Sequence, residues 1–179
     1  MAARRARPAR DRGAPRPVLD AAGARRVAGD LLSRKSWSTR ELRARLRRRG
    51  APAEVAEAVV ADLERRGYLD DPSFARRWAE SRASDRRVGS LRLSGELRAK
   101  GIPADAAAAA VHDAFAEVPE EERALEAARR RLAQLRKGPA DRAASRLRDH
   151  LLRRGYPPAL VHRVLKRLLP STEVDPTTD

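Results

Sequence analysis

The chain has 179 residues, which suffices for one ordinary domain or for a short array of small modules. The absence of cysteine excludes disulfide bonds and thiolate metal sites. The formal net charge of +15 favours a polyanionic partner, with nucleic acid ahead of a membrane surface.

A compositional bias toward arginine is the alternative explanation of this charge, since only four of the 40 basic residues are lysine. Such a bias explains the choice of arginine over lysine, but it does not explain the excess of basic over acidic residues. No apolar run approaches the roughly 20 residues of a membrane-spanning helix. The basic first residues also lack the apolar segment of a secretory signal. We therefore expect a soluble, cytoplasmic protein that does not enter a membrane.

The first third of the chain begins with a basic arm. Residues 1–17 contain six arginines, one aspartate and three prolines, and we expect disorder because they cannot bury a core. Helices are predicted at about 20–35 and at 38–49. Ser38 and Glu41 have the spacing of a capping box at the start of the second helix.

The middle of the chain repeats this order. A helix is predicted at 72–86, with Asp71 as its N-cap. Phe74 and Trp78 share its apolar face, and a second helix is predicted at 89–100. Aromatic residues form only 3% of the chain, and all of them fall at positions typical of a core. Each core must therefore be small and consist mainly of leucine, valine and alanine.

The last third opens with a predicted helix at 119–137. Three glutamates stand at its start and two basic residues at its end, as the helix dipole favours. The final residues, 171–179, are acidic and polar, and we expect them to form a disordered tail.

Three turns of one form divide the helical part of the chain. Gly50, Gly101 and Gly155 each follow a basic residue and each precede a proline by two positions. Leucines stand four and eight positions before each glycine, and apolar residues return on one helical face after it. Glycine after a cation is typical of a helix end, and the same pair occurs at Gly67 and Gly138.

This spacing predicts an all-α fold. We expect a tandem array of three three-helix repeats at 18–69, 70–118 and 119–170. A three-helix unit of this length buries little by itself, so neighbouring units are expected to stack into a curved, elongated molecule.

Candidates for catalysis are weak. Asp70 and Asp71 are adjacent carboxylates without convergent partners, and they are interpreted as helix-capping residues. The three histidines are scattered, and no pair has the spacing of metal ligands on one helix. No serine has the context of a nucleophile, and no glycine-rich loop could hold a phosphate. We expect neither enzymatic activity nor a cofactor or metal.

The arginines offer a binding surface. Arg40, Arg43 and Arg47 fall opposite the inner leucines of their helix, and Arg92 and Arg98 flank those of theirs. Any one of them could simply face solvent, but together they favour a stripe against a polyanion. Because the aromatic residues occupy core-like positions, contacts with nucleic acid should be mainly to phosphates and weakly sequence-specific.

One segment resembles the signature of the RecX family of recombination regulators. It runs from Arg66 to Ala75, and the resemblance continues through Trp78, Arg82 and Gly89 to 96–102. The residues of this motif to which we assign a structural role are Gly67, Tyr68, Leu69, Asp70, Asp71, Phe74, Gly89 and Gly101. The resemblance covers about residues 20–169, although the basic arm and the high arginine content are not part of the family's pattern.

The resemblance implies tandem three-helix repeats and a partner, the RecA recombinase filament on DNA. It implies roles in homologous recombination, DNA repair and the SOS response. Members of the family reduce ATP hydrolysis, strand exchange and co-protease activity of the filament, and no cofactor is implied. The candidate contacts are Arg40, Arg43, Arg47, Arg82, Arg86, Arg87, Arg92, Arg98 and Lys100.

Two other functions remain open from the sequence alone. A general basic DNA-binding or nucleoid-type protein would bind bare duplex by charge alone, with a steep dependence on salt. A helical scaffold would have no contact with nucleic acid. We expect a monomer, but the sequence does not distinguish capping of filament ends from binding in the filament groove.

Overall fold

The computed structural model describes residues 18–86, 88–135 and 142–169. The predicted basic arm and acidic tail, Arg87 and the predicted helix end at Gly138 lie outside these ranges. The described residues form nine α-helices and contain no strand, which confirms the all-α prediction. The helices are α1 (Ala21–Leu32), α2 (Thr39–Arg48), α3 (Ala53–Arg65), α4 (Asp71–Arg86), α5 (Ser90–Ala99), α6 (Ala104–Ala114), α7 (Glu120–Leu135), α8 (Ala143–Arg153) and α9 (Pro158–Leu168).

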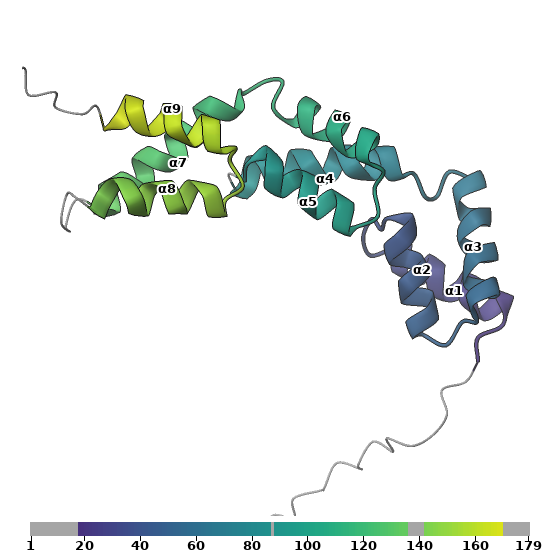
Figure 1. The fold of residues 1–179 in the computed structure, drawn as a ribbon. Coiled ribbons are helices and arrows are strands. Elements are labelled where there is room, and N and C mark those ends of the chain that lie inside the picture. The colour runs from purple at the N-terminus through teal and green to yellow at the C-terminus, as the bar shows by residue number, and fades with distance from the viewer. Residues whose placement is uncertain (1–17, 87, 136–141, 170–179) are drawn as a thin grey trace, which may run out of the picture.

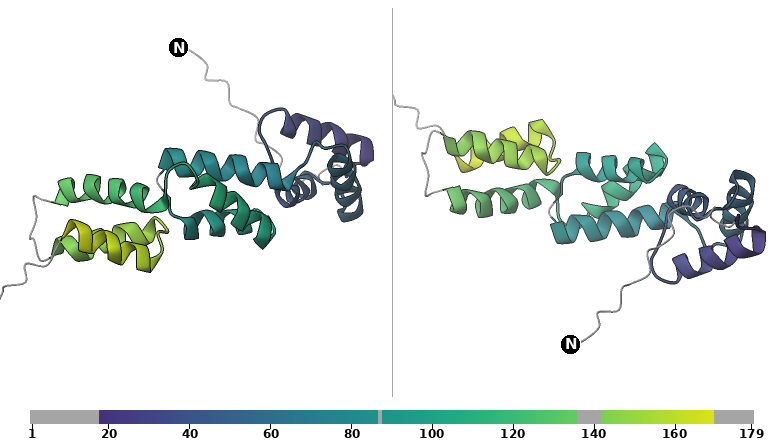
Figure 2. Two further views of the ribbon diagram at one scale, coloured as in Figure 1. Left: turned by 90° about the horizontal axis from the view of Figure 1, so that it is seen from above. Right: turned by 90° about the horizontal axis from the view of Figure 1, so that it is seen from below.

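The helices pack in three groups of three, α1–α3, α4–α6 and α7–α9. Figure 1 shows the groups following one another along a curved, elongated molecule. The three groups are also separate from one another in both views of Figure 2. We call the groups repeats 1, 2 and 3. The tandem array is thus confirmed, while the boundaries at 69/70 and 118/119 stay a prediction.

Each repeat has its own apolar core. The leucine pairs that define the repeat, such as Leu42 and Leu46 of α2, are completely buried in all three groups. Repeat 2 has the smallest side chains, because six of its twelve buried core residues are alanine. Phe74 and the partly buried Trp78 fill its remaining space, with ring centroids 6.0 Å apart.

The predicted glycine turns end four of the described helices. Gly50, Gly67, Gly101 and Gly155 have φ values of 102°, 73°, 86° and 83°, in the left-handed region that glycine tolerates. At the three repeat-defining turns, the residue after the glycine donates a hydrogen bond to a carbonyl five residues earlier, which completes a Schellman motif. The residue in that position is buried at each of these turns, and it is Ala51, Ile102 or Tyr156.

The prediction that Asp71 caps the helix of repeat 2 is wrong. Helix α4 begins at Asp71 itself, and the backbone N–H of Ser73 donates to Oδ1 of Asp70 at 2.9 Å. Asp70 is therefore the N-cap, and Pro72 stands one position further into the helix than expected. Oδ1 of Asp71 instead accepts a hydrogen bond from the backbone N–H of Thr39, 2.9 Å away in repeat 1.

The prediction that every aromatic residue lies at a core position is also wrong. Tyr156 is completely buried and Phe74 is 5% exposed, but Tyr68 is 67% exposed. The physical reason is the turn at Gly67, which directs Leu69 into the core of repeat 1 and leaves the ring of Tyr68 on the surface.

Candidate partner-binding surface

The joint between repeats 1 and 2 is formed by the start of α2 and the turn after α5. The hydroxyl of Ser38, completely buried, donates to the carbonyl of Lys100 at 2.7 Å and accepts from the N–H of Glu41 at 3.2 Å. A Cβ on Gly101 would lie 2.6 Å from Cβ of Arg40. The turn thus needs glycine both for its φ value and for the close approach of the next repeat.

The joint between repeats 2 and 3 is built in the same way. The N–H groups of Gly89 and Leu91 donate to the carbonyls of Arg154 and Gly155 at 2.8 and 3.1 Å. A Cβ on Gly155 would meet the backbone of Arg92. Each joint therefore seats the N-terminus of a repeat's second helix on the glycine turn of the following repeat. A carbonyl of the turn accepts from the Ser38 hydroxyl in the first joint, and two carbonyls accept from backbone N–H groups in the second.

A carboxylate completes each joint. Asp71, the first residue of α4, accepts from the N–H of Thr39, and Glu120, the first residue of α7, accepts from the N–H of Ser90 at 2.7 Å. Thr39 and Ser90 are the first residues of α2 and α5, so the two contacts are equivalent. The two joints therefore repeat one arrangement along the array, in which the first helix of a repeat supplies a carboxylate to the second helix of the preceding repeat.

Lys100 lies inside the first joint. Its Nζ is 2.7 Å from Oε1 of Glu41, and its side chain is 15% exposed. The same ammonium lies 3.9 Å from the ring centroid of Trp78 and 5.5 Å from that of Phe74. The carboxylate belongs to repeat 1 and the two rings belong to repeat 2. Lys100 therefore connects the two repeats in the isolated chain.

Arg82 is also engaged within the molecule. Its Nε and one terminal nitrogen donate to the two oxygens of Glu96 at 2.8 and 2.6 Å, which joins α4 to α5. These bonds, together with one from Arg92, lower the pKa of Glu96 to about 2 despite its partial burial. The same pair raises the pKa of Arg82. Arg92 reaches from Glu96 toward the carbonyl of Arg153 in repeat 3, at 3.4 Å.

The other candidate contacts divide by exposure. Arg40, Arg47 and Arg98 are exposed on their helices, whereas Arg43 pairs with Glu57 on α3. The side chain of Arg86 and the whole of Arg87 lie outside the described part of the chain. The structure thus brings Arg82 and Arg92 together on one glutamate, and the binding role of the nine candidates stays a prediction.

Charge is distributed unevenly along the repeats, and none of the predicted contacts lies in the most basic one. Residues 70–118 contain eight basic and eight acidic residues, whereas residues 119–170 contain 14 basic and six acidic ones. Counting charges by repeat would have revealed this, yet no candidate was placed in repeat 3. Its exposed basic side chains are Arg129, Arg130, Arg142, Arg146, Arg148, Arg153, Arg163, Lys166 and Arg167.

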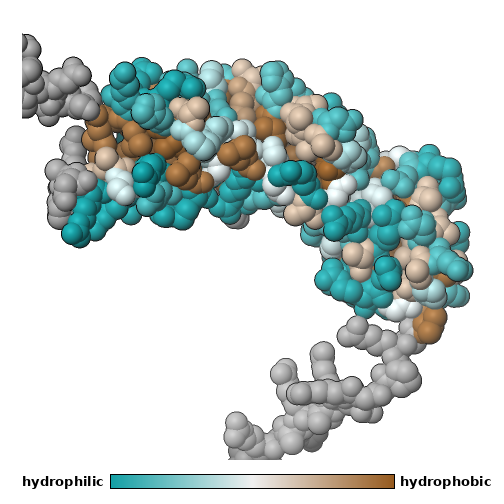
Figure 3. All heavy atoms as spheres, in the orientation of Figure 1, coloured by the Kyte–Doolittle hydropathy of each residue, from teal (hydrophilic) through white to brown (hydrophobic). Residues whose placement is uncertain are grey.

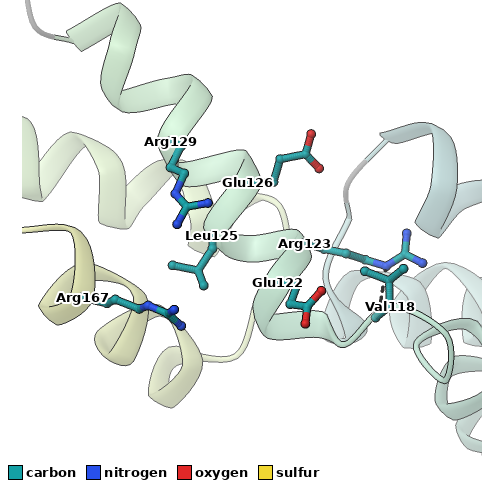
Figure 4. A pocket seen from close by; sticks show the side chains of 7 residues that line it. All are labelled: Val118, Glu122, Arg123, Leu125, Glu126, Arg129 and Arg167. Atoms are coloured by element: carbon teal, nitrogen blue, oxygen red, sulfur yellow. Dashed lines mark hydrogen bonds between the residues drawn. The ribbon is translucent and has the colours of Figure 1, made fainter.

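Hydrophilic surface accordingly covers α8 along one edge of repeat 3, while apolar surface shows between α8 and α9 (Figure 3). One hollow of about 460 Å³ lies beside α7 and combines Glu122 and Glu126 with arginines from α7 and α9. Figure 4 shows Arg129 and Arg167 on either side of Leu125 in this hollow. Charges of both signs line it, so it does not select for an anion.

Two classes of site have no support in the part of the chain that the structure describes. No cluster of three histidine or carboxylate side chains could hold a metal ion there. None of those helices is long and apolar enough to span a membrane. What the fold and its surface do define is a tandem array of three-helix repeats with a strongly cationic third repeat, an architecture with an extended surface suited to contact with a partner.

Comparison with known proteins assigns the family. Models of the first, second and third three-helix domains of RecX match residues 24–63, 70–111 and 119–165. The chain belongs to the RecX family of regulatory proteins, and it is therefore a regulatory protein and not an enzyme.

Curated relatives match over most of their length. Regulatory protein RecX of Amycolatopsis mediterranei is 36% identical over 146 residues, which is 82% of this chain and 83% of the relative. That of Thermobifida fusca is 37% identical over 154 residues, or 86% of this chain and 83% of the relative. The crystal structure of RecX from Lactobacillus salivarius has a TM-score of 0.73 at 15% identity, covering 83% of this chain and 96% of that one. This last likeness supports the fold alone.

Proposed function

We propose that this chain binds the RecA recombinase filament on DNA and inhibits its ATPase, strand-exchange and co-protease activities. The observation that carries the proposal is the match of three RecX domains, in order, along the described helices. The curved array supports it, because an elongated contour can follow a helical polymer over several subunits.

The proposed mechanism is a shift in the filament's equilibrium between conformations. A ligand shifts such an equilibrium only by binding one state more tightly than the other. Hydrogen bonds at Ser38 and Gly89 connect successive repeats, and the mechanism requires these joints to hold the angle between repeats. An array of fixed curvature fits one filament geometry best and opposes the change that accompanies nucleotide hydrolysis.

Exposed arginines on two repeats form the proposed contact with the filament. Arg40 and Arg47 lie on α2 and Arg98 lies on α5, and all three side chains are open to solvent. Arg82 and Lys100 would first have to leave their glutamates, so in the proposed complex Arg82 holds α4 to α5 and Lys100 holds repeat 2 to repeat 1.

The test is inhibition of the cognate recombinase's DNA-dependent ATPase. We expect the triple variant Arg40→Glu, Arg47→Glu and Arg98→Glu to lose inhibition while keeping its helical content. A matched control reverses three exposed charges on α1 and directly after it, with Arg25→Glu, Arg26→Glu and Arg34→Glu. Equal inhibition by both variants would remove the proposed contact surface, and failure of the unmodified protein to inhibit would remove the function.

A second candidate function is general binding to DNA, which the excess of eight positive charges in residues 119–170 favours. A pull-down at roughly 150 mM salt, with recombinase filaments beside bare duplex, separates the two functions. Preference for the filament supports the regulator, and equal retention supports the general DNA-binding protein. We further propose that the chain acts as a cytoplasmic monomer, where a filament on DNA is accessible to it.

A further inference from the structure

A second hollow in repeat 3 differs from the one in Figure 4 in the sign of its charges. It lies between α7 and α8, has a volume of about 260 Å³, and is open to solvent. The described residues that line it are Ala127, Arg130, Arg131, Gln134, His150 and Arg154. Three of these six side chains are guanidinium groups, and none is a carboxylate.

One buried donor at this hollow has no hydrogen-bond partner. One terminal nitrogen of Arg131 donates to Oε1 of Gln134 at 3.0 Å, but its Nε is buried without a partner. Nε of Arg154 donates to Nε2 of His150 at 3.0 Å, so that this imidazole nitrogen acts as the acceptor. A guanidinium offers five donors, and an unmet buried donor gains free energy when an acceptor reaches it.

The imidazole between these groups lies in a positive potential. The pKa of His150 is lowered, first by burial and then by Arg154, Arg131 and Arg153. Asp149, on the same helix, pairs with Arg148, and Glu126 of α7 pairs with Arg130. Each of these two carboxylates is paired with an arginine, and neither lines the hollow.

The cationic surface continues beyond the hollow along α8. Arg142, Arg146 and Arg153 are exposed and fall within about 40° of one another around the helix, at 100° per residue. They span about 16 Å along its axis at 1.5 Å per residue. A duplex carries one negative charge per about 1.7 Å of its length, so a row of this length faces several phosphates.

We propose that the hollow between α7 and α8 holds a backbone phosphate of nucleic acid, with Arg131, Gln134 and Arg154 as its donors and the α8 arginines along the adjoining phosphates. This inference deepens the proposed function and rests on it, because it assigns the nucleic-acid contact of the filament complex to repeat 3. The planar fork of arginine matches the oxygens of a phosphate, and the open shape of the hollow admits a polymer. Tyr156, the aromatic residue next in sequence, is fully buried, so its ring is not offered for base stacking.

The test measures binding of a short labelled duplex by fluorescence anisotropy, without recombinase, over a range of salt concentrations. The test variant combines Arg131→Gln with Arg154→Gln. The matched control combines Arg129→Gln with Arg167→Gln, which removes two charges from the hollow on the other side of α7. Circular dichroism and the thermal midpoint establish that each variant is folded. A lysine pair, Arg131→Lys and Arg154→Lys, keeps the charge and removes the fork.

We expect the glutamine pair to weaken binding about tenfold more than its control does, because it removes charge-assisted hydrogen bonds to the phosphate. The slope of the logarithm of affinity against the logarithm of salt concentration should become shallower by about one further unit for each phosphate that is no longer neutralised. The affinity of the lysine pair should lie between the affinities of the glutamine pair and its control. Equal affinities for the glutamine pair and its control would overturn the site, as would full affinity in the lysine pair. Because recombinase is absent, these outcomes are independent of whether the chain inhibits the filament's ATPase.

Discussion

At the scale of single residues, the strongest electrostatic feature is the carboxylate of Glu96, which holds Arg82 and Arg92. These two arginines were expected to face a partner, and the structure instead shows them joining α4 to α5 and approaching repeat 3. Periodicity places an arginine on a helix face, but a glutamate 14 residues further along the chain decides whether it is available. That pairing is tertiary, so sequence spacing could not reveal it.

Glu96→Gln tests this pair through its pH dependence. The folded-state pKa of about 2 lies below the ordinary value of 4.5, so the pair stabilises the fold above pH 4.5 and loses its effect as pH falls toward 2. The difference corresponds to about 3 kcal/mol near neutral pH. In urea unfolding, the variant should be less stable by about 2–3 kcal/mol at pH 7, and this gap should narrow below pH 4.5. Glu80→Gln, at an exposed position of α4, serves as the control.

His150 provides a second pH-dependent prediction. Its pKa is lowered below 6.5 in the folded chain, so the unfolded chain binds the proton more readily. Stability should therefore decrease as pH falls below 6.5, and His150→Gln should remove that part of the decrease. Chemical unfolding at several pH values measures the free energy of unfolding of the variant and of the unmodified chain. An identical pH profile for the variant and the unmodified chain would show that neither burial nor the surrounding arginines lower the pKa of His150 in the folded chain.

At the scale of helices and turns, the glycines give the sharpest comparison. The sequence predicted the turns because glycine after a cation, with proline two positions later, satisfies the end of one helix and begins another. It did not predict that the same glycines seat the neighbouring repeat, since that closeness depends on the joint. Asp71 was assigned to the wrong role for the same reason, because its carboxylate accepts a hydrogen bond from the backbone N–H of Thr39 in another repeat.

Three alanine substitutions separate these effects. Gly95 lies within α5 with open space around it, so Gly95→Ala should stabilise the chain by up to about 1 kcal/mol. Gly67 also has open space but a positive φ, so Gly67→Ala should destabilise by about 1–2 kcal/mol. Gly101→Ala should cost more than Gly67→Ala, because its Cβ would collide with Arg40. Thermal and urea unfolding rank the variants, and equal costs for Gly67→Ala and Gly101→Ala would show that the joint yields.

At the scale of the whole molecule, the sequence predicted the array, its helical order and its curvature, because repeated turns impose repeated contacts. The candidate contacts were harder to predict, because arginines with the same helical spacing can face solvent, form ion pairs within the chain or contact a partner. The exposed ring of Tyr68 was missed because an aromatic beside a buried leucine resembles a core position. The composition alone predicts that the middle repeat is neutral and the third repeat is basic. The middle repeat therefore serves to position its neighbours, and the third repeat attracts polyanions.

The curvature itself can be tested at the first joint. The double variant Ser38→Ala and Asp71→Ala removes the hydroxyl bond to Lys100 and the acceptor of the Thr39 N–H without touching an arginine. Because each repeat keeps its own core, helical content should be retained, while hydrogen exchange at Thr39 should accelerate and small-angle scattering should show a wider range of molecular lengths. Ser81→Ala with Glu80→Ala, at exposed positions of α4, makes a similar chemical change away from the joint.

If inhibition depends on a fixed curve, the joint variant inhibits the recombinase ATPase more weakly than this control, since part of its binding free energy is used to restore the angle. The comparison is made at equal protein concentration, with the same filament preparation for both variants. A loosened joint with undiminished inhibition would instead show that the repeats bind the filament independently of one another.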